Sequence, residues 1–273
     1  MKMLKVLKVV LPVLLLATLL VSGCSTILVP KDGETETGET ETRKYDIGEF
    51  TRVDINSAFS YEIEHADTYS VSITARSNLF DDINVTMEGQ TLIVGMEPFH
   101  DPWTTINISP NPKVVITMPQ LRGLDSSGAT GGIVAGFSSS ENLDITASGA
   151  SEVELAGISA DNVIFDLSGA SEVTGDIEAE NVELDLSGAS TIQLKGSADS
   201  ITAEVSGACD LLLAGLEAKD ASIVLSGASN GSVNLDGTLD ADLSGASTLE
   251  YTGEPTLGIM DITGSSVLKR SSL

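Results

Sequence analysis

Histidine, cysteine, aromatic and basic residues are scarce in this sequence. The 273 residues include two His and two Cys, which excludes most zinc sites and any disulfide framework. Aromatic residues make up 4% of the chain, and 14 Lys and Arg stand against 40 Asp and Glu, a net charge of −26. This balance argues against a nucleic-acid partner, because such a protein needs a basic surface to displace counterions from phosphates.

Glycine and aliphatic residues, in contrast, are plentiful. The 26 glycines argue against a coiled coil or a helical bundle, because glycine destabilises the interior of a helix. The many Val, Ile and Leu residues argue against a largely disordered chain, since they supply enough apolar surface for a core.

Residues 1–23 have the features of a secretory signal peptide. Lys2, Lys5 and Lys8 precede an apolar run that is too short for a comfortable membrane span. The run ends in Val-Ser-Gly-Cys at residues 21–24, which resembles the lipobox of bacterial lipoproteins. The resemblance implies cleavage before Cys24 and a lipid on its sulfur. The less favoured alternative is an ordinary secretory signal in which Cys24 is incidental. We therefore expect an exported protein anchored in the cell envelope, at the outer membrane, on its periplasmic face or at the cell surface.

Residues 24–44 are predicted to form a disordered tether that follows the lipidated cysteine. Their centre repeats Glu, Thr and Gly with no apolar period, so the segment cannot bury enough surface to order itself.

An internal repeat dominates the rest of the chain. The motif Ser-Gly-Ala-Ser, intact or altered, recurs at intervals of 21, 20, 19, 19, 20, 18 and 19 residues. Its copies begin at Ser127, Ser148, Ser168, Ser187, Ser206, Ser226, Ser244 and Thr263. A nearly constant period of this size indicates a solenoid.

The pattern inside each repeat indicates strands. Apolar residues alternate in three short stretches per repeat, and each stretch is bounded by Gly, Ser, Asp or Asn. A repeat of about 19 residues at about 3.3 Å per residue has a perimeter of about 63 Å, which suits a compact three-sided coil. We therefore predict an all-β fold, a right-handed parallel β-helix over residues 123–273. Residues 45–122, which are less regular, are predicted to form an N-terminal β cap.

Three positions of the motif support this prediction. The residue before the motif is apolar and predicts an inward ladder of Leu167, Leu186, Val205, Leu225, Leu243 and Ile262. The motif Gly turns a corner where a Cβ does not fit. Cys209, at the last position of its motif, is predicted to be a small buried or half-buried residue and not a catalytic thiol.

Several segments together resemble the head GIN domain family, which carries an adhesin label. They are residues 52–56, the strand-like segment 114–119, the Ser-Gly-Ala-Ser ladder and residues 251–255, so the resemblance covers residues 45–273. Members of that family more often have Ser-Gly-Ser-Gly-Asp at the corner, which is altered here. The resemblance implies an envelope-exposed β-helix and implies no reaction.

Acidic residues recur two positions before the motif: Asp125, Asp166, Asp185, Glu204, Asp242 and Asp261. On alternating strands they would point outward, about 4.8 Å apart, and their repulsion would favour a bound cation. Calcium is the natural candidate because it takes oxygen ligands. The alternative, a solvated acidic face, is favoured because the Gly-Gly-x-Gly-x-Asp pattern of calcium-binding β-rolls is absent.

No cofactor is otherwise expected, and no catalytic constellation is evident. Between residues 125 and 268 there are 24 acidic and two basic residues, too few bases for a lyase that acts on an anionic polysaccharide. The carboxylates recur with the repeat, as expected of a scaffold and not of one unique site.

Phe99, His100 and Trp103 form a candidate contact loop, or else cover the end of the cap.

We therefore expect a non-catalytic binding or structural module, adhesin-like, whose ligand is a glycan or a surface protein. Two alternatives remain at this stage: a β-helix enzyme acting on surface glycans, and a calcium-dependent structural module.

Overall fold

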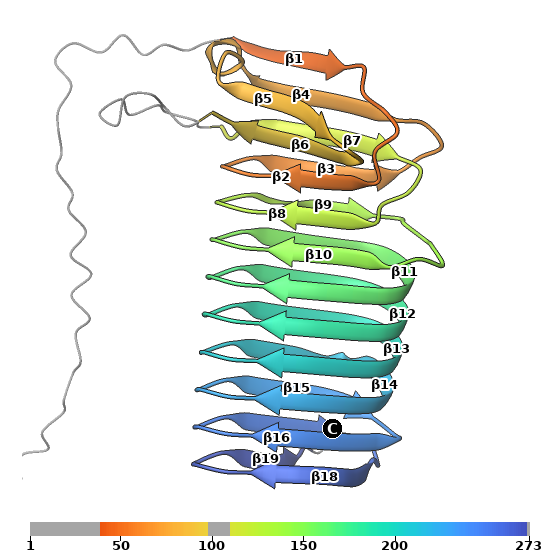
Figure 1. Ribbon diagram of the computed structural model, residues 1–273, viewed down its shortest axis with the longest axis vertical. Helices are drawn as coiled ribbons and strands as arrows, with labels where there is room; N and C mark the ends of the chain where they lie inside the picture. Colours follow the sequence, from red (N-terminus) through yellow and green to blue (C-terminus); the bar gives the residue numbers. More distant parts are fainter. Residues whose placement is uncertain (1–38, 98–109, 272–273) are drawn as a thin grey trace, which may run out of the picture. The chain divides into compact units, whose positions relative to one another are not determined.

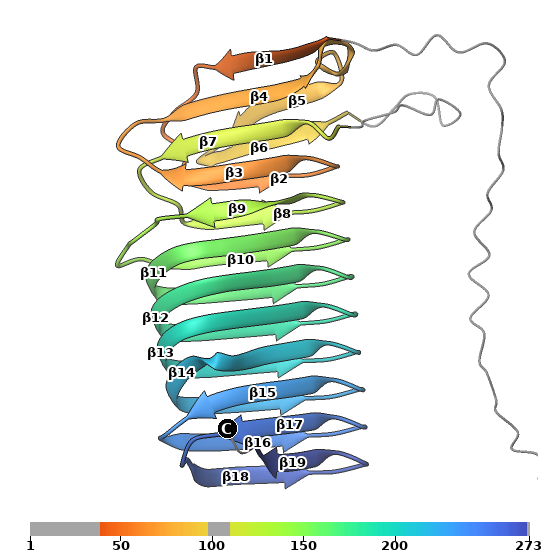
Figure 2. The same ribbon diagram turned by 180° about the vertical axis from the view of Figure 1, so that it is seen from behind.

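The computed structural model describes residues 39–97 and 110–271, which form a stack of β-strand coils (Figure 1). The chain crosses one face of the stack, turns sharply, returns along the opposite face and curves round into the next coil (Figure 2). The coils wind in a right-handed sense and pair in parallel, which confirms the predicted β-helix. The described part contains one short 3-10 helix, Ser77–Leu79, and no helix that is long and apolar enough to cross a membrane.

Four of the strands are long enough to run around most of a coil. They are β11 (Glu152–Leu167), β12 (Glu172–Leu186), β13 (Thr191–Val205) and β14 (Asp210–Leu225). In β11 the alternation of buried and exposed residues resets near Gly157 and Asn162, which marks two bends. The three alternating stretches expected from the sequence are therefore present, but they join into one curved strand.

The remaining coils divide into shorter strands. Above the long strands lie β8 (Gly123–Ser126), β9 (Gly131–Ala135) and β10 (Leu143–Ala147). Below them lie β15 (Asn230–Leu235), β16 (Thr238–Leu243), β17 (Thr248–Thr252), β18 (Thr256–Ile262) and β19 (Val267–Arg270).

The motif glycines form a stacked column at the sharp turn. Each has a positive φ, for example 76° at Gly188, and the N–H of the following alanine donates to the glycine carbonyl one coil earlier over 2.7–2.9 Å. A Cβ on Gly188 would lie 2.6 Å from the carbonyl oxygen of Gly169. The column starts at Ser57, a non-glycine residue with φ of 75°, whose carbonyl accepts from Ala129. The corner thus needs glycine for its backbone conformation and for close stacking.

The last motif position is a buried polar column. Ser190, Ser229 and Ser247 are fully buried, and each hydroxyl donates to the carbonyl three residues earlier over 2.8–2.9 Å. Cys209 is also fully buried, and its sulfur lies 3.2 Å from the Ser206 carbonyl oxygen. The prediction of a small buried cysteine is confirmed.

The apolar ladder before the motif is confirmed over all but its last position. Leu167, Leu186, Val205, Leu225 and Leu243 are buried. Burial of a side chain of this size contributes about 1.5–3 kcal/mol. Ile262 is the exception, with 42% of its surface exposed, because no further coil of the described chain covers it.

The segment before the repeats folds in a different order from its sequence. Its strands are β1 (Thr40–Tyr45), β2 (Arg52–Ile55), β3 (Ser60–His65), β4 (Ser70–Arg76), β5 (Ile83–Glu88), β6 (Thr91–Met96) and β7 (Lys113–Met118). The coil made by β2 and β3 lies between β6 and β7 on one side and β8 and β9 on the other, all in parallel. The antiparallel strands β5, β4 and β1 follow beyond β6 and β7.

Strand β1 shortens the predicted tether. The predicted tether extends to residue 44, whereas residues 40–45 pair along their whole length with β4. The segment has no apolar alternation of its own, so its order comes from backbone hydrogen bonds to a neighbouring strand. Local sequence patterns do not reveal such a partner.

Two glycines make room for large side chains where this segment meets the repeats. Gly132 lies beside Tyr61, whose buried hydroxyl donates to Ser126 over 3.4 Å. Gly123 leaves space for Arg52 to reach past it and form an ion pair of 2.8 Å with Asp144. This ion pair therefore joins strands that are two layers apart.

We predict that Gly188→Ala destabilises the fold far more than Gly157→Ala. Both glycines have a positive φ, but a Cβ on Gly157 would meet nothing within 4 Å, whereas one on Gly188 would strike the backbone. Gly157→Ala should cost about 1–2 kcal/mol from the backbone conformation alone, and Gly188→Ala at least about 3 kcal/mol.

Thermal unfolding of both variants, followed by circular dichroism, checks this prediction. Each 1 kcal/mol corresponds to about 2–4 °C at this size. Equal losses in the two variants would show that close stacking of the turns does not limit the stability.

Candidate functional site

The acidic residues predicted from the repeat do form one outward column. Strand register places Asp125 beside Thr146, and then Asp166, Asp185, Glu204, Val224, Asp242 and Asp261 in successive coils. Asp54 of β2 extends the column beyond Asp125. Asp54 is not among the predicted members because β2 precedes the repeats, although its alternating Arg-Val-Asp-Ile resembles the strands that carry the other members.

Asp54 is the member of this column with the clearest electrostatic strain. Partial burial, together with repulsion from Asp125, raises the pKa of the Asp54 carboxyl, while a hydrogen bond with Asn56 acts in the opposite direction. Because the folded state favours protonated Asp54, this carboxyl stabilises the fold below its unfolded pKa of about 3.9. That contribution is lost as the pH rises through the folded pKa.

We predict that Asp54→Asn raises the melting temperature at pH 7, by about 1–3 °C. The amide removes the partly buried charge and its repulsion with Asp125. The gain should shrink as the pH falls toward 4, where the wild-type carboxyl becomes protonated. Melting curves of both proteins between pH 4 and pH 8 test this, and a gain that does not depend on pH would contradict it.

The column is not a ready-made metal site. Across the described ranges, no group of three or more His, Cys, Asp or Glu side chains is placed to hold a metal ion. The calcium hypothesis itself stays a prediction.

We expect thermal unfolding of residues 37–273 to be the same in calcium and in excess chelator. A ligand that binds only the folded state raises its stability by mass action. A rise of 10 °C or more in calcium, lost in a variant with Asp166→Asn and Asp185→Asn, would make the column a calcium site.

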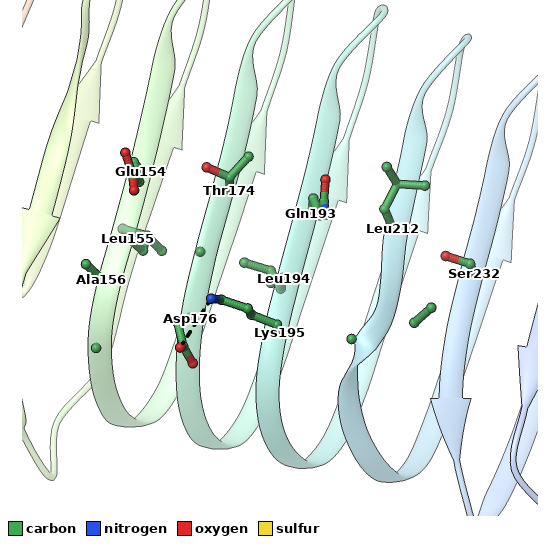
Figure 3. A pocket seen from close by; sticks show the side chains of 14 residues that line it. Glu154, Leu155, Ala156, Thr174, Asp176, Gln193, Leu194, Lys195, Leu212 and Ser232 are labelled. Atoms are coloured by element: carbon green, nitrogen blue, oxygen red, sulfur yellow. Dashed lines mark ion pairs between the residues drawn. The ribbon is translucent and has the colours of Figure 1, made fainter. Parts of the chain in front are cut away.

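A second feature is a shallow groove of about 560 Å³ on another side of the coils, crossing strands β11 to β15 (Figure 3). Its floor carries a row of outward side chains aligned by register. The row consists of Glu154, Thr174, Gln193, Leu212 and Ser232.

The groove owes its shape to missing side chains and to a shift in register. Gly157 and Gly215 are exposed and leave backbone uncovered beside the row. Gly175 also lines the groove, but it stands in the inward column of Leu155, where a Cβ would lie 2.7 Å from the Leu155 Cβ. The pairing of β13 with β14 slips between Gln193 and Lys195, so an extra residue bulges from β14 at this level. Bulges of this kind bend a strand and redirect its side chains.

The charges in the groove nearly cancel. Lys195 lies beside Asp176 of the preceding coil, with 3.6 Å between the ammonium nitrogen and a carboxylate oxygen. Glu154 is the other carboxylate of the lining, and it belongs to a different column from Asp176. The lining contains no His, Cys or Arg. The groove therefore offers hydroxyl, amide and carboxylate groups next to the aliphatic Leu212, and can form hydrogen bonds to a neutral polar ligand.

This row is not among the predicted site residues, although every repeat contains its position. Each member stands three residues after the last motif residue, as Gln193 follows Ser190. The side chains differ from coil to coil, so no repeated residue type marked the column. The bulge corresponds to the one extra residue in the interval from Ser206 to Ser226, which is 20 residues long against 19 from Ser187 to Ser206. The interval alone does not indicate on which side of the coil the extra residue lies.

The other candidate residues lie outside the described ranges. They are Cys24, with the signal segment before it, and Phe99, His100 and Trp103 of the contact loop. The lipid anchor and the contact loop therefore stay predictions.

Comparison with known proteins identifies the family. A family model described as "Putative auto-transporter adhesin, head GIN domain" matches residues 49–176 and 165–255, which is most of the chain. The chain belongs to the head GIN domain family. The match confirms the family resemblance that the sequence motifs carry. No curated protein matches this head GIN chain.

Solved structures share the head GIN fold. A putative adhesin from Parabacteroides distasonis superposes with a TM-score of 0.78 at 18% identity, covering 86% of this chain and 98% of its own. A putative lipid binding protein from the same species superposes with a TM-score of 0.72 at 21% identity, with the same coverage of both chains. A putative adhesin from Bacteroides fragilis gives 0.62 at 19% identity, covering 85% and 97%. At these identities the likeness shows the fold alone.

Proposed function

We propose that this protein is a non-catalytic, adhesin-like binding module of the cell envelope, anchored through a lipid on Cys24, and that its groove holds a neutral glycan strand. The groove across β11 to β15 is the observation that carries the proposal. The adhesin description of the family supports the general class.

The periodic construction of the groove favours a polymer over a folded protein. Equivalent positions recur once per coil, about 4.8 Å apart, so five coils offer a line of side chains about 20 Å long. A linear polysaccharide likewise repeats its hydroxyl groups at regular intervals. Thr174, Gln193 and Ser232 supply donors and acceptors, and Leu212 supplies an apolar contact.

Charge favours a neutral strand over an anionic one. Residues 125–252 carry 22 acidic and two basic residues, so a polyanion would be repelled along the whole solenoid. The basic residue in the groove, Lys195, is already neutralised by Asp176.

We predict that residues 37–273 are retained on a printed array of neutral oligosaccharides and not on polygalacturonate. Gln193→Trp, which places a large ring in the middle of the row, should weaken retention at least about 10-fold. Thr202→Trp is the matched control, because Thr202 is an exposed residue of the same strand on a different side of the coil. The proposal is contradicted if the Gln193→Trp variant is retained as strongly as the wild type. It is also contradicted if Thr202→Trp weakens retention as much as Gln193→Trp does.

A hydrolysis assay separates binding from catalysis. Glycoside hydrolases use two carboxylates that flank the scissile bond, and the groove contains Glu154 and Asp176. We expect no new reducing ends when the array sugars are incubated with the protein. If reducing ends are released by the wild-type protein and not by the Glu154→Gln variant, the protein is a glycosidase and not a non-catalytic binding module.

A further inference from the structure

The C-terminal end of the stack exposes the cross-section of the core. This surface, the C-terminal end face, consists of Leu257, Met260, Ile262 and Leu268 on β18 and β19. Their partners one coil earlier are Leu239, Ala241, Leu243 and Leu249, which are all buried. The same inward columns thus continue into the last coil, where Leu257 and Ile262 are 45% and 42% exposed.

The end face also has unpaired strand edges. Strand β18 pairs with β16 and strand β19 pairs with β17, and neither has a second partner in the described chain. Backbone N–H and C=O groups along the outer edge of both strands are therefore open to another strand. Next to this edge lie Ile259, 77% exposed, and Val267, 48% exposed. An apolar core joined to a free edge is a surface that pairs readily with other strands.

The opposite end of the stack is closed. There Leu79 and Phe80 are buried, and the Arg43 guanidinium lies 4.1 Å from the centre of the Phe80 ring. Strand β1 forms the outermost layer, with exposed Glu41, Arg43 and Lys44. Charged side chains on an edge strand oppose further pairing. A head-to-tail contact would bury these charges against the apolar end face, whereas a contact between two end faces would not.

The charges at the C-terminal end also allow two copies to meet there. The rest of the solenoid is strongly acidic, with 22 acidic and two basic residues over positions 125–252. Over positions 253–271, Glu254 and Asp261 are balanced by Lys269 and Arg270. Lys269 forms an ion pair of 2.8 Å with Glu250, and Arg270 pairs with Glu254. Repulsion between two copies is therefore lower at this end than along the sides of the solenoid.

We infer that the C-terminal end face binds a second copy of this chain, giving a two-fold dimer in which the two solenoids join end to end. A two-fold axis perpendicular to the stack brings strands of opposite direction together, so pairing across the interface is antiparallel. The contact is self-complementary and closes at two copies. It covers the core cross-section of both chains and leaves the groove and the acidic column free.

The full chain, expressed in a bacterial envelope and treated with a flexible bis-maleimide, tests this inference. Thr263→Cys places a thiol in the last turn, beside the end face, and should give a cross-linked dimer. Thr40→Cys places the thiol on β1 at the closed end and should give none. Cys209 is buried, and Cys24 is common to both variants, so the comparison isolates the introduced thiol.

A charge on the end face should separate the two copies. Ile262→Lys in the Thr263→Cys chain should lower the dimer yield at least about 10-fold, because two lysines would be buried at a symmetric contact. Ile259→Lys is a second variant at a highly exposed site, for use if Ile262→Lys reduces protease resistance. Val224→Lys, at an exposed site in the middle of the stack and outside the groove, should leave the yield unchanged. A monomer band alone, equal cross-linking at Thr40, or a yield unaffected by both end-face lysines would overturn the inference.

Discussion

The hydrogen bond from each motif alanine to the glycine carbonyl one coil earlier sets the register of the whole stack. It forms where the backbone has a positive φ and where successive turns approach too closely for a Cβ. Because every coil is fixed at this corner, residues at the same distance from the motif occupy the same column. The inward ladder, the buried serines, the acidic column and the groove row all follow from that alignment.

The repeat made much of the fold predictable. A fixed period and alternating stretches suffice for a parallel β-helix, and the motif correctly placed Leu167, Leu243 and Cys209 in the interior. The exposure of Ile262 was not predicted, because burial at the end of a stack depends on a neighbouring layer and not on the residue itself. Strand β1 escaped prediction for the same reason, since β4 alone gives it order.

The candidate site was only partly predictable. The acidic column repeats a residue type at a fixed position, so the sequence revealed it. The groove row varies from Glu154 to Ser232, and its depth depends on glycines and on a register slip near Gln193. Features that break a repeat carry no periodic signal, yet they distinguish one side of a solenoid from the others. Here the two features lie on different sides, so the acidic face can keep the chain in solution while the groove stays nearly neutral.

The position of the β2–β3 coil has a consequence for the order in which the chain acquires structure. Each repeat coil completes its contacts with residues about 20 positions away, as Ser171 does with Ser190, 19 positions apart. The first coil instead makes contacts with distant residues, as in the hydrogen bond from Tyr61 to Ser126, which are 65 positions apart. Closing that longer loop costs more conformational entropy than closing the short loops within the repeats. The repeat coils, whose contacts are more local, therefore order more readily than the first coil. Enclosure of the first coil between the N-terminal strands and the repeats is the assembly step with the longest loop.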